Sequence, residues 1–189
     1  MANLTVVYDA NVLYSASLRD LFVELATTDI VEARWTEEIH EEWMRNVLIN
    51  RPDIRFEQLS RTKRLMNANV KDCLVQGYET IIQELELPDP ADRHVLAAAI
   101  GSSSKFIITF NLKDFPEEVL APYDILAQHP DDFLLDLLEL DWQTVCEAAE
   151  KQRIRLKNPP KTPDEYLETL VKLGLPLSAT RMRELCYPD

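Results

Sequence analysis

The stretch that decides the fold is TVVYDANVLY, residues 5–14. Its first four residues are apolar or β-branched and predict a short buried strand, Thr5–Tyr8. A turn at the Asp-Ala-Asn of residues 9–11 follows, and apolar residues then recur at helical spacing as far as Leu25. The stretch therefore predicts a strand, a turn and a helix, with an acidic residue where the strand ends.

The same alternation of strand and helix continues along the chain. Further strands are predicted at Ile30–Trp35, Lys105–Thr109 and Tyr123–Ala127, with a weak one within Cys73–Ile82. Because the strands are nearly continuous apolar runs separated by helical segments, they predict a parallel sheet covered on both faces. We expect a three-layer α/β/α fold whose central parallel sheet has about five strands.

Helical patterns fill the rest of the sequence. Thr36 is a candidate N-cap for a helix that ends near Ile49, because two glutamates follow it in the first turn. The other predicted helices are Arg51–Val70, Asp92–Ile100, Pro130–Leu140, Trp142–Arg155, Pro163–Leu173 and Ser178–Cys186. The pattern divides the chain into an α/β domain, residues 1–135, and a helical C-terminal extension, residues 136–189.

Composition limits the possible classes of protein. The 189 residues are 46% hydrophobic and 28% charged, which is typical of one globular domain with a small appendage. Apolar runs stay well below the roughly 18 residues of a membrane span, and the first residues lack the pattern of a secretion signal, so we expect a cytoplasmic protein and no membrane partner. The net charge of −13 argues against non-specific coating of nucleic acid.

Charge and cysteines are unevenly placed. Seven basic residues stand against two acidic ones between Trp43 and Lys71, which is typical either of a solvated helix surface or of a local nucleic-acid contact. The three cysteines, Cys73, Cys146 and Cys186, are odd in number and widely spaced, without a CxxC pair. We expect all three to be reduced and structural, and no zinc site.

Acidic residues recur where ligands bind in an open parallel sheet, beyond the carboxyl ends of the strands. Asp9 ends the first strand, Asp114 follows the strand at 105–109, and Asp92 opens the helix before that strand. Each alone could be a helix cap or a turn residue. Several converging carboxylates would repel one another unless a cation neutralised them, and oxygen ligands suit Mg²⁺ or Mn²⁺. Sequence order alone does not establish that they converge.

Four segments together resemble the motif regions of a known family. They are VVYDANVLYSA (6–16), WTEEIHEEWMRNVL (35–48), LPDPADRHVLAAAI (87–100) and FIITFNLKDFP (106–116). In order and in type they resemble the four motif regions of PIN-domain ribonucleases, a family that includes the toxins of bacterial type II toxin–antitoxin pairs. The resemblance covers about residues 4–135 and implies a PIN-like nuclease domain.

The resemblance implies roles for the acids of the first three segments. Asp9 matches the family's first acid, with Asn11 beside it. Glu42 matches the second acid because a bulky residue follows it, and Glu41 and Glu38, which lie nearby in the sequence, are the alternatives. Asp92 matches the third acid, at the head of an Ala-rich helix.

The fourth segment, TFNLKDF, resembles the family's Thr-x-Asp/Asn block, residues 109–115. Its early position is Asn111, so Asp114 would supply the fourth carboxylate. Thr109 would donate a hydrogen bond that orients Asp9 or its water.

The family mechanism implied is hydrolysis of RNA phosphodiester bonds assisted by Mg²⁺ or Mn²⁺. Asp9, Asp92 and Asp114 would hold the metal, and Glu42 would act directly or through water. Arg45, one turn beyond Glu42, is a candidate for binding the RNA backbone. Resemblance to the toxins also implies an antitoxin protein as partner and a homodimer.

Other interpretations compete with a nuclease. A non-catalytic RNA- or protein-binding module of the same fold would show the same patterns. A phosphotransfer or phosphatase α/β domain also places Asp after its first strand, but residues 9–11 read Asp-Ala-Asn where a dehalogenase-like phosphatase has Asp-x-Asp. His40 and His94 flank the candidate acids, and we expect them to be surface or packing residues.

Overall fold

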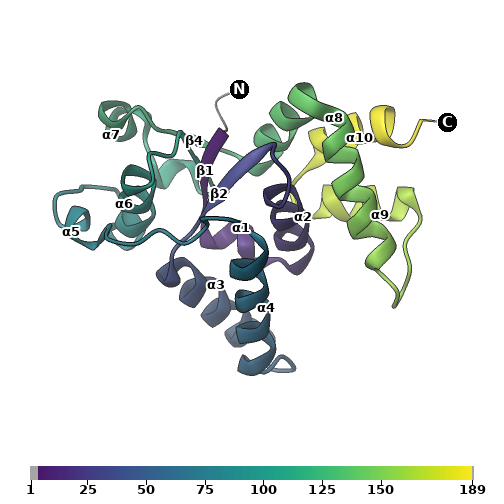
Figure 1. Cartoon of the computed structure of the whole chain (residues 1–189), viewed down its shortest axis with the longest axis horizontal. Coiled ribbons are helices and arrows are strands. Elements are labelled where there is room, and N and C mark those ends of the chain that lie inside the picture. The colour runs from purple at the N-terminus through teal and green to yellow at the C-terminus, as the bar shows by residue number, and fades with distance from the viewer. Residues whose placement is uncertain (1–3, 189) are drawn as a thin grey trace.

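A computed structural model describes residues 4–188 and contains one four-stranded sheet (Figure 1). Its strands are β1 (Leu4–Tyr8), β2 (Val31–Arg34), β3 (Phe106–Ile108) and β4 (Leu126–Gln128). They stand in the order β2-β1-β3-β4, and every pairing is parallel. The predicted α/β class with a central parallel sheet is confirmed.

The weak fifth strand expected within residues 73–82 does not form. Trp35 and Leu74 make a single parallel bridge there. Gly77 then adopts a φ of +74°, a conformation that a glycine takes without steric cost, and the chain turns away from the sheet. Glu79–Ile82 forms the short helix α5. The expectation of about five strands was therefore one too many.

Helices and 3-10 turns connect the strands. They are α1 (Ala10–Tyr14), α2 (Ala16–Ala26), α3 (Glu37–Asn50), α4 (Phe56–Asn69), η1 (Pro90–Asp92), α6 (Arg93–Gly101), η2 (Leu112–Asp114), α7 (Glu117–Leu120) and η3 (Ala121–Tyr123). Thr36 caps α3 as predicted, because its hydroxyl accepts a hydrogen bond from Ile39 N over 3.0 Å. Helix α6 packs on β1 and β3, whereas α2 lies on the other side of the sheet against β2 and α8 (Figure 1).

The C-terminal region consists of α8 (Pro130–Arg155), α9 (Pro163–Lys172) and α10 (Pro176–Cys186). The predicted break between the helices at 130–140 and 142–155 is confirmed, because α8 consists of two helices that meet at a kink where Asp141 has non-helical φ and ψ of −155° and 80°. Phe133, near the start of α8, is fully buried, and its ring lies 6.4 Å from that of Tyr8. The C-terminal helices thus begin inside the core of the α/β domain. The boundary between residues 135 and 136 stays a prediction.

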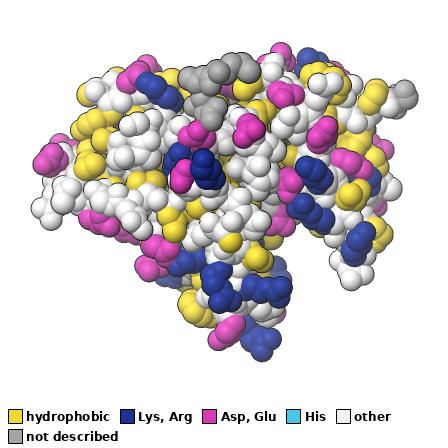
Figure 2. Space-filling view, viewed as in Figure 1, with side chains coloured by type: hydrophobic (Ala, Val, Ile, Leu, Met, Phe, Trp, Pro, Cys, Tyr) yellow, Lys and Arg dark blue, Asp and Glu magenta, His cyan; other side chains and the backbone are white. Residues whose placement is uncertain are grey.

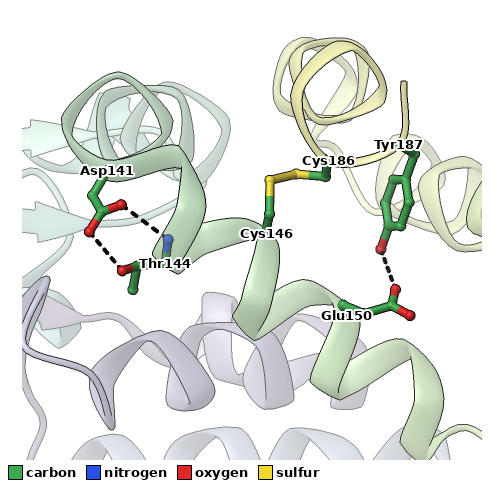
Figure 3. The surroundings of a disulfide bond; sticks show 6 residues. All are labelled: Asp141, Thr144, Cys146, Glu150, Cys186 and Tyr187. Carbon is green, nitrogen blue, oxygen red and sulfur yellow. Dashed lines mark hydrogen bonds between the residues drawn. A yellow bond between two sulfur atoms is a disulfide. The ribbon is translucent and has the colours of Figure 1, made fainter. Parts of the chain in front are cut away.

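A disulfide between Cys146 and Cys186 joins α8 to α10 (Figure 3). The expectation of reduced cysteines is therefore wrong for this pair, whereas Cys73 is free and buried. The two Cα atoms lie 5.2 Å apart, although 40 positions separate the residues in the sequence. Only the packing of α10 on α8 brings the two cysteines together, and their spacing in the sequence does not indicate that packing.

Among residues 4–188, no helix is both long enough and apolar enough to cross a membrane.

Candidate active site

A pocket of about 330 Å³ opens beyond the carboxyl ends of β1 and β3, where open parallel sheets bind ligands. Helices α1 and α3 and the start of α6 supply the rest of its wall. The lining contains three acids, four asparagines and one tyrosine: Asp9, Glu42, Asp92, Asn11, Asn46, Asn50, Asn111 and Tyr14. Segments far apart in the sequence therefore meet at one place.

Asp9 is fixed by hydrogen bonds from three directions. It follows β1 directly and is only 4% exposed. Its Oδ1 accepts a hydrogen bond from Ala10 N over 2.7 Å, which caps α1. Its Oδ2 accepts from Thr109 Oγ1 and from Asn11 Nδ2, each over 2.7 Å. The hydrogen bond expected between Thr109 and Asp9 is therefore present.

Asn11 and Thr109 also tie the loop after β3 to the first turn of α1. Asn11 Oδ1 accepts a hydrogen bond from Phe110 N over 3.1 Å, and Asn11 Nδ2 lies 3.0 Å from Thr109 Oγ1. The Thr109 hydroxyl in turn accepts from Asn111 N over 3.0 Å. These bonds hold the ends of β1 and β3 together, so Asp9 and Asn111 face one pocket.

The other two acids of the pocket come from separate helices. Glu42 lines it from α3, whereas its neighbour Glu41 lines a different groove, between α3 and α4. The structure therefore places Glu42, and not Glu41, beside Asp9. Asp92 stands at the N-terminus of α6, and its side chain makes no capping hydrogen bond to that helix. The Asp92 carboxylate therefore has no capping role at this helix.

Burial and mutual repulsion disfavour the charged forms of these acids. Burial raises the pKa of Asp9 to about 6, with a further upward contribution from the charge of Glu42, although the Thr109 hydrogen bond acts in the opposite direction. Burial, followed by the charges of nearby carboxylates with Asp9 foremost, raises the pKa of Asp92 to about 7. Perturbed acids in a cleft are typical of functional sites.

Asp114, the fourth predicted acid, lies in η2 and does not line the pocket. Asn111 lines it instead, although the charge of Asp114 contributes to the raised pKa of Asp92. Throughout residues 4–188, no three His, Cys, Asp or Glu side chains form a group that could hold a metal ion. A four-carboxylate metal site therefore stays a prediction.

His94 contacts the site, which the sequence did not predict. It is 5% exposed, and its Nε2 lies 3.4 Å from Glu42 Oε2. Burial lowers the pKa of His94, but the hydrogen bond to Glu42 and the charges of nearby glutamates outweigh it, so the pKa is raised overall. His40 is buried and bonded to Asn67 and Trp43, as a packing residue would be. The only signal for His94 was its place two residues after Asp92.

Arg45, the predicted RNA contact, does not line the acidic pocket. It lines a larger groove of about 950 Å³ between α3 and α4, together with Phe56, Lys63 and Arg64. Figure 2 shows Lys and Arg side chains gathered over α3 and α4, in the lower part of the view. The basic segment of the sequence is thus concentrated on a surface that shares α3 with the acidic pocket.

Comparison with known proteins identifies both parts of the chain. Residues 5–113 match the family model described as PIN domain, and residues 130–184 match the one described as VapC50 C-terminal domain. A stretch of 94 residues is 43% identical to "Putative ribonuclease VapC50" of Mycobacterium tuberculosis (strain ATCC 25618 / H37Rv). That stretch is 50% of this chain and 55% of the relative, so the match spans about half the length of each protein.

No solved structure matches the chain. The PIN-domain match covers more than half of the sequence and includes Asp9, Glu42, Asp92 and their hydrogen-bond partners. The resemblance inferred from the four motif segments is confirmed, and the chain belongs to the PIN-domain family.

Proposed function

We propose that this protein is a divalent-metal-dependent endoribonuclease that hydrolyses RNA phosphodiester bonds at the acidic pocket. The observation that carries the proposal is the meeting of Asp9, Glu42 and Asp92 from three distant segments at the carboxyl end of the sheet. A similar relative is named a ribonuclease, and the pocket lies within the matched PIN domain.

The donor set fits a hard cation. Carboxylate oxygens are the ligands that Mg²⁺ and Mn²⁺ prefer. Burial first, and repulsion by neighbouring carboxylates second, raise the pKa of Asp92, and a cation would relieve that repulsion. Asp9 and Asp92 of the pocket lining, together with Asp114 from η2, would hold the metal, with Glu42 as the fourth catalytic acid. Their spacing in residues 4–188 does not form a metal-binding group, so the ion would have to draw them together. When bound, the ion would help to activate a water and to stabilise charge on the scissile phosphate.

The remaining roles follow from contacts within the chain. Thr109 and Asn11 hold the carboxylate of Asp9 in one orientation, and Asn111 closes the pocket from the loop after β3. Arg45 would bind the RNA backbone from the neighbouring groove, because a guanidinium attracts phosphate and the groove shares α3 with the pocket.

We also propose that the enzyme is the toxin of a toxin–antitoxin pair, with an antitoxin protein as partner, and that it acts in the cytoplasm as a homodimer. The match of residues 130–184 to the VapC50 C-terminal domain supports this branch of the family. The separate matches of residues 5–113 and 130–184 support two regions, a nuclease domain and a helical extension, which we place at residues 1–135 and 136–189.

The rival proposal is a non-catalytic binding module of the same fold. It is favoured by one observation, that no group of acids in residues 4–188 is arranged to hold a metal. Metal titration separates the two proposals. A nuclease with a metal site gains stability when Mn²⁺ binds the folded state, whereas a module without a metal site does not.

The deciding experiment uses the purified full chain and a panel of single-stranded and structured RNAs in Mn²⁺, Mg²⁺ or EDTA. We expect metal-dependent cleavage that is lost in the double variant Asp9→Asn, Asp92→Asn. Asp29→Asn is the matched control, because Asp29 is exposed, lies outside the pocket lining and is not among the charges that act on Asp92. If no metal supports cleavage and Mn²⁺ stabilises neither wild type nor variant, the nuclease proposal is wrong.

A further inference from the structure

The acidic pocket has two ends of different chemistry. Three of its lining residues are acids, Asp9, Glu42 and Asp92, and the others are neutral. The neutral end follows α3 from Glu42 to Asn50, the last residue of that helix. Glu42, Asn46 and Asn50 stand four residues apart on α3, so they form one stripe on a single face of that helix. Each step along the stripe is about 6 Å. The pocket therefore leads from carboxylates to amides along one helix.

The amides at the neutral end have free hydrogen-bonding capacity. Within residues 4–188, the side chain of Asn46 makes no hydrogen bond. Asn50 Nδ2 donates to Asn46 O over 2.9 Å, which leaves the Asn50 Oδ1 available. Tyr14, from the end of α1, is 37% exposed and adds an aromatic ring to the same lining.

These groups match a nucleobase better than a phosphate. The described lining of the pocket contains no Lys or Arg to attract phosphate. An asparagine amide presents a donor beside an acceptor, the arrangement found on the edge of a base. An exposed aromatic ring offers a face on which an unpaired base can stack. Bases inside a duplex have their edges paired and their faces stacked, so only an unpaired base could use both features.

We propose that Asn46, Asn50 and Tyr14 form a nucleobase-binding subsite for single-stranded RNA, next to the scissile phosphate. Tyr14 stacks on the base, and the Asn46 amide bonds to its edge. The inference rests on the proposed nuclease function for the position of the phosphate, but base binding itself does not require cleavage. Asn46 would therefore determine which base is preferred beside the cut.

The first test measures binding alone. Fluorescently labelled hexanucleotides of rA, rC, rG or rU, and one containing an abasic position, are titrated into Asp92→Asn protein in Mg²⁺. We expect one base to bind tightest, and Asn46→Ala in the same background to reduce that preference at least threefold. Tyr14→Leu should weaken binding of the base-containing hexanucleotides about tenfold, and Tyr14→Phe should restore it, because stacking needs only the ring.

The chain supplies a matched control for the amides. Asn69 ends α4 as Asn50 ends α3, and each donates its amide to the carbonyl four residues earlier, over 2.7 Å and 2.9 Å. Only Asn50 lines the pocket. We expect Asn50→Ala to weaken binding of the preferred hexanucleotide about threefold, whereas Asn69→Ala should leave it unchanged. Equal binding by the wild-type background, the Asn46→Ala variant and the Asn69→Ala variant would overturn the subsite.

The second test maps cleavage positions in a single-stranded RNA library by sequencing. We expect Asn46→Ala to cleave with a flatter base distribution at the cut, while Asn69→Ala keeps the wild-type distribution. Cleavage with an unchanged distribution in Asn46→Ala would refute the subsite and leave the nuclease standing. Absent cleavage by wild type, together with base preference in binding that depends on Asn46, would refute the nuclease and leave the subsite standing.

Discussion

The hydroxyl of Thr109 donates a hydrogen bond to the carboxylate of Asp9 over 2.7 Å, and the two residues lie 100 positions apart in the sequence. Both residues are buried, so water cannot readily replace this hydrogen bond, and breaking it would destabilise the folded state. The bond joins the ends of β1 and β3, the two central strands of the sheet. The orientation of Asp9 thus depends on the pairing of β1 with β3.

Replacing Thr109 with Val keeps the side-chain shape and removes this bond, together with the bonds that the hydroxyl accepts from Asn11 Nδ2 and Asn111 N. A buried carboxylate that loses a donor is less stable in its charged form, so we expect the free energy of unfolding to fall by about 1–2 kcal/mol at neutral pH. The pKa of Asp9 should rise further, because the Thr109 hydrogen bond lowers it. Urea unfolding measures the first effect, and cleavage rate reports the orientation of Asp9.

Thr109→Ser is the control for that variant, because it keeps the hydroxyl and loses only a methyl group. We expect Ser to retain most of the cleavage activity. If the Val variant equals wild type in both stability and cleavage, the hydrogen bond has no role in holding the acid.

The parts of the fold that follow from local patterns were predictable. Four strands, the Thr36 cap and the position of Asp9 after β1 depend on short apolar runs and on turn residues, which are visible in a window of a few residues. The fifth strand failed because Gly77 turned the chain away from the sheet after a single bridge. Here the positive φ of Gly77 outweighed the weak strand pattern of residues 73–82.

The parts of the site that depend on packing were less predictable. Asn111 and Asp114 belong to one loop, and the sequence does not show which faces the pocket. The hydrogen bond from Asn111 N to Thr109 directs this loop, so Asn111 lines the pocket and Asp114 does not. The contact between His94 and Glu42 joins α6 to α3 and has no signature in either segment.

The raised pKa of Asp92 predicts how stability depends on pH when metal is absent. In the folded state, burial and neighbouring charges raise this pKa from 3.8 to about 7, so the folded protein keeps a proton that the unfolded chain releases. The free energy of unfolding therefore falls as pH rises from about 4 to about 7, and it stays lower above that range.

Asp92→Asn removes this penalty. In EDTA at about pH 8, we expect the variant to exceed wild type by about 1 kcal/mol, a value discounted because the side chain is half-exposed and its repulsions are screened. Near pH 4 the advantage should become small, because Asp92 is then protonated in the folded state and roughly 40% protonated in the unfolded state. Urea unfolding at both pH values measures the difference, with Asp29→Asn as control, because Asp29 is exposed and is not among the charges that raise the pKa of Asp92. An advantage that is independent of pH would show that repulsion is not its cause.

Arg45 should contribute to RNA binding through charge. It lines the groove between α3 and α4 and is exposed. We expect Arg45→Ala to weaken binding of all RNAs alike and to reduce the dependence of log K on log salt concentration by about one unit or less. The Mn²⁺-induced rise in melting temperature should not change. Arg61→Ala tests for a general charge effect, because Arg61 is exposed on α4 outside that groove lining. Equal losses in the two variants would mean that Arg45 makes no specific contact.

The Cys146–Cys186 disulfide should stabilise the packing of α10 on α8 (Figure 3). A cross-link over 40 positions restricts the unfolded chain, and loop-closure entropy gives about 3–4 kcal/mol for that length. In a reducing compartment both cysteines would be thiols, so the free energy of unfolding is compared with and without reductant. We expect reductant to lower the free energy of unfolding of wild type by about 3 kcal/mol. The double variant Cys146→Ala, Cys186→Ala should not respond to reductant, whereas Cys73→Ala should respond like wild type. Three titratable thiols in the unreduced, unfolded wild type would show that the bond is not formed.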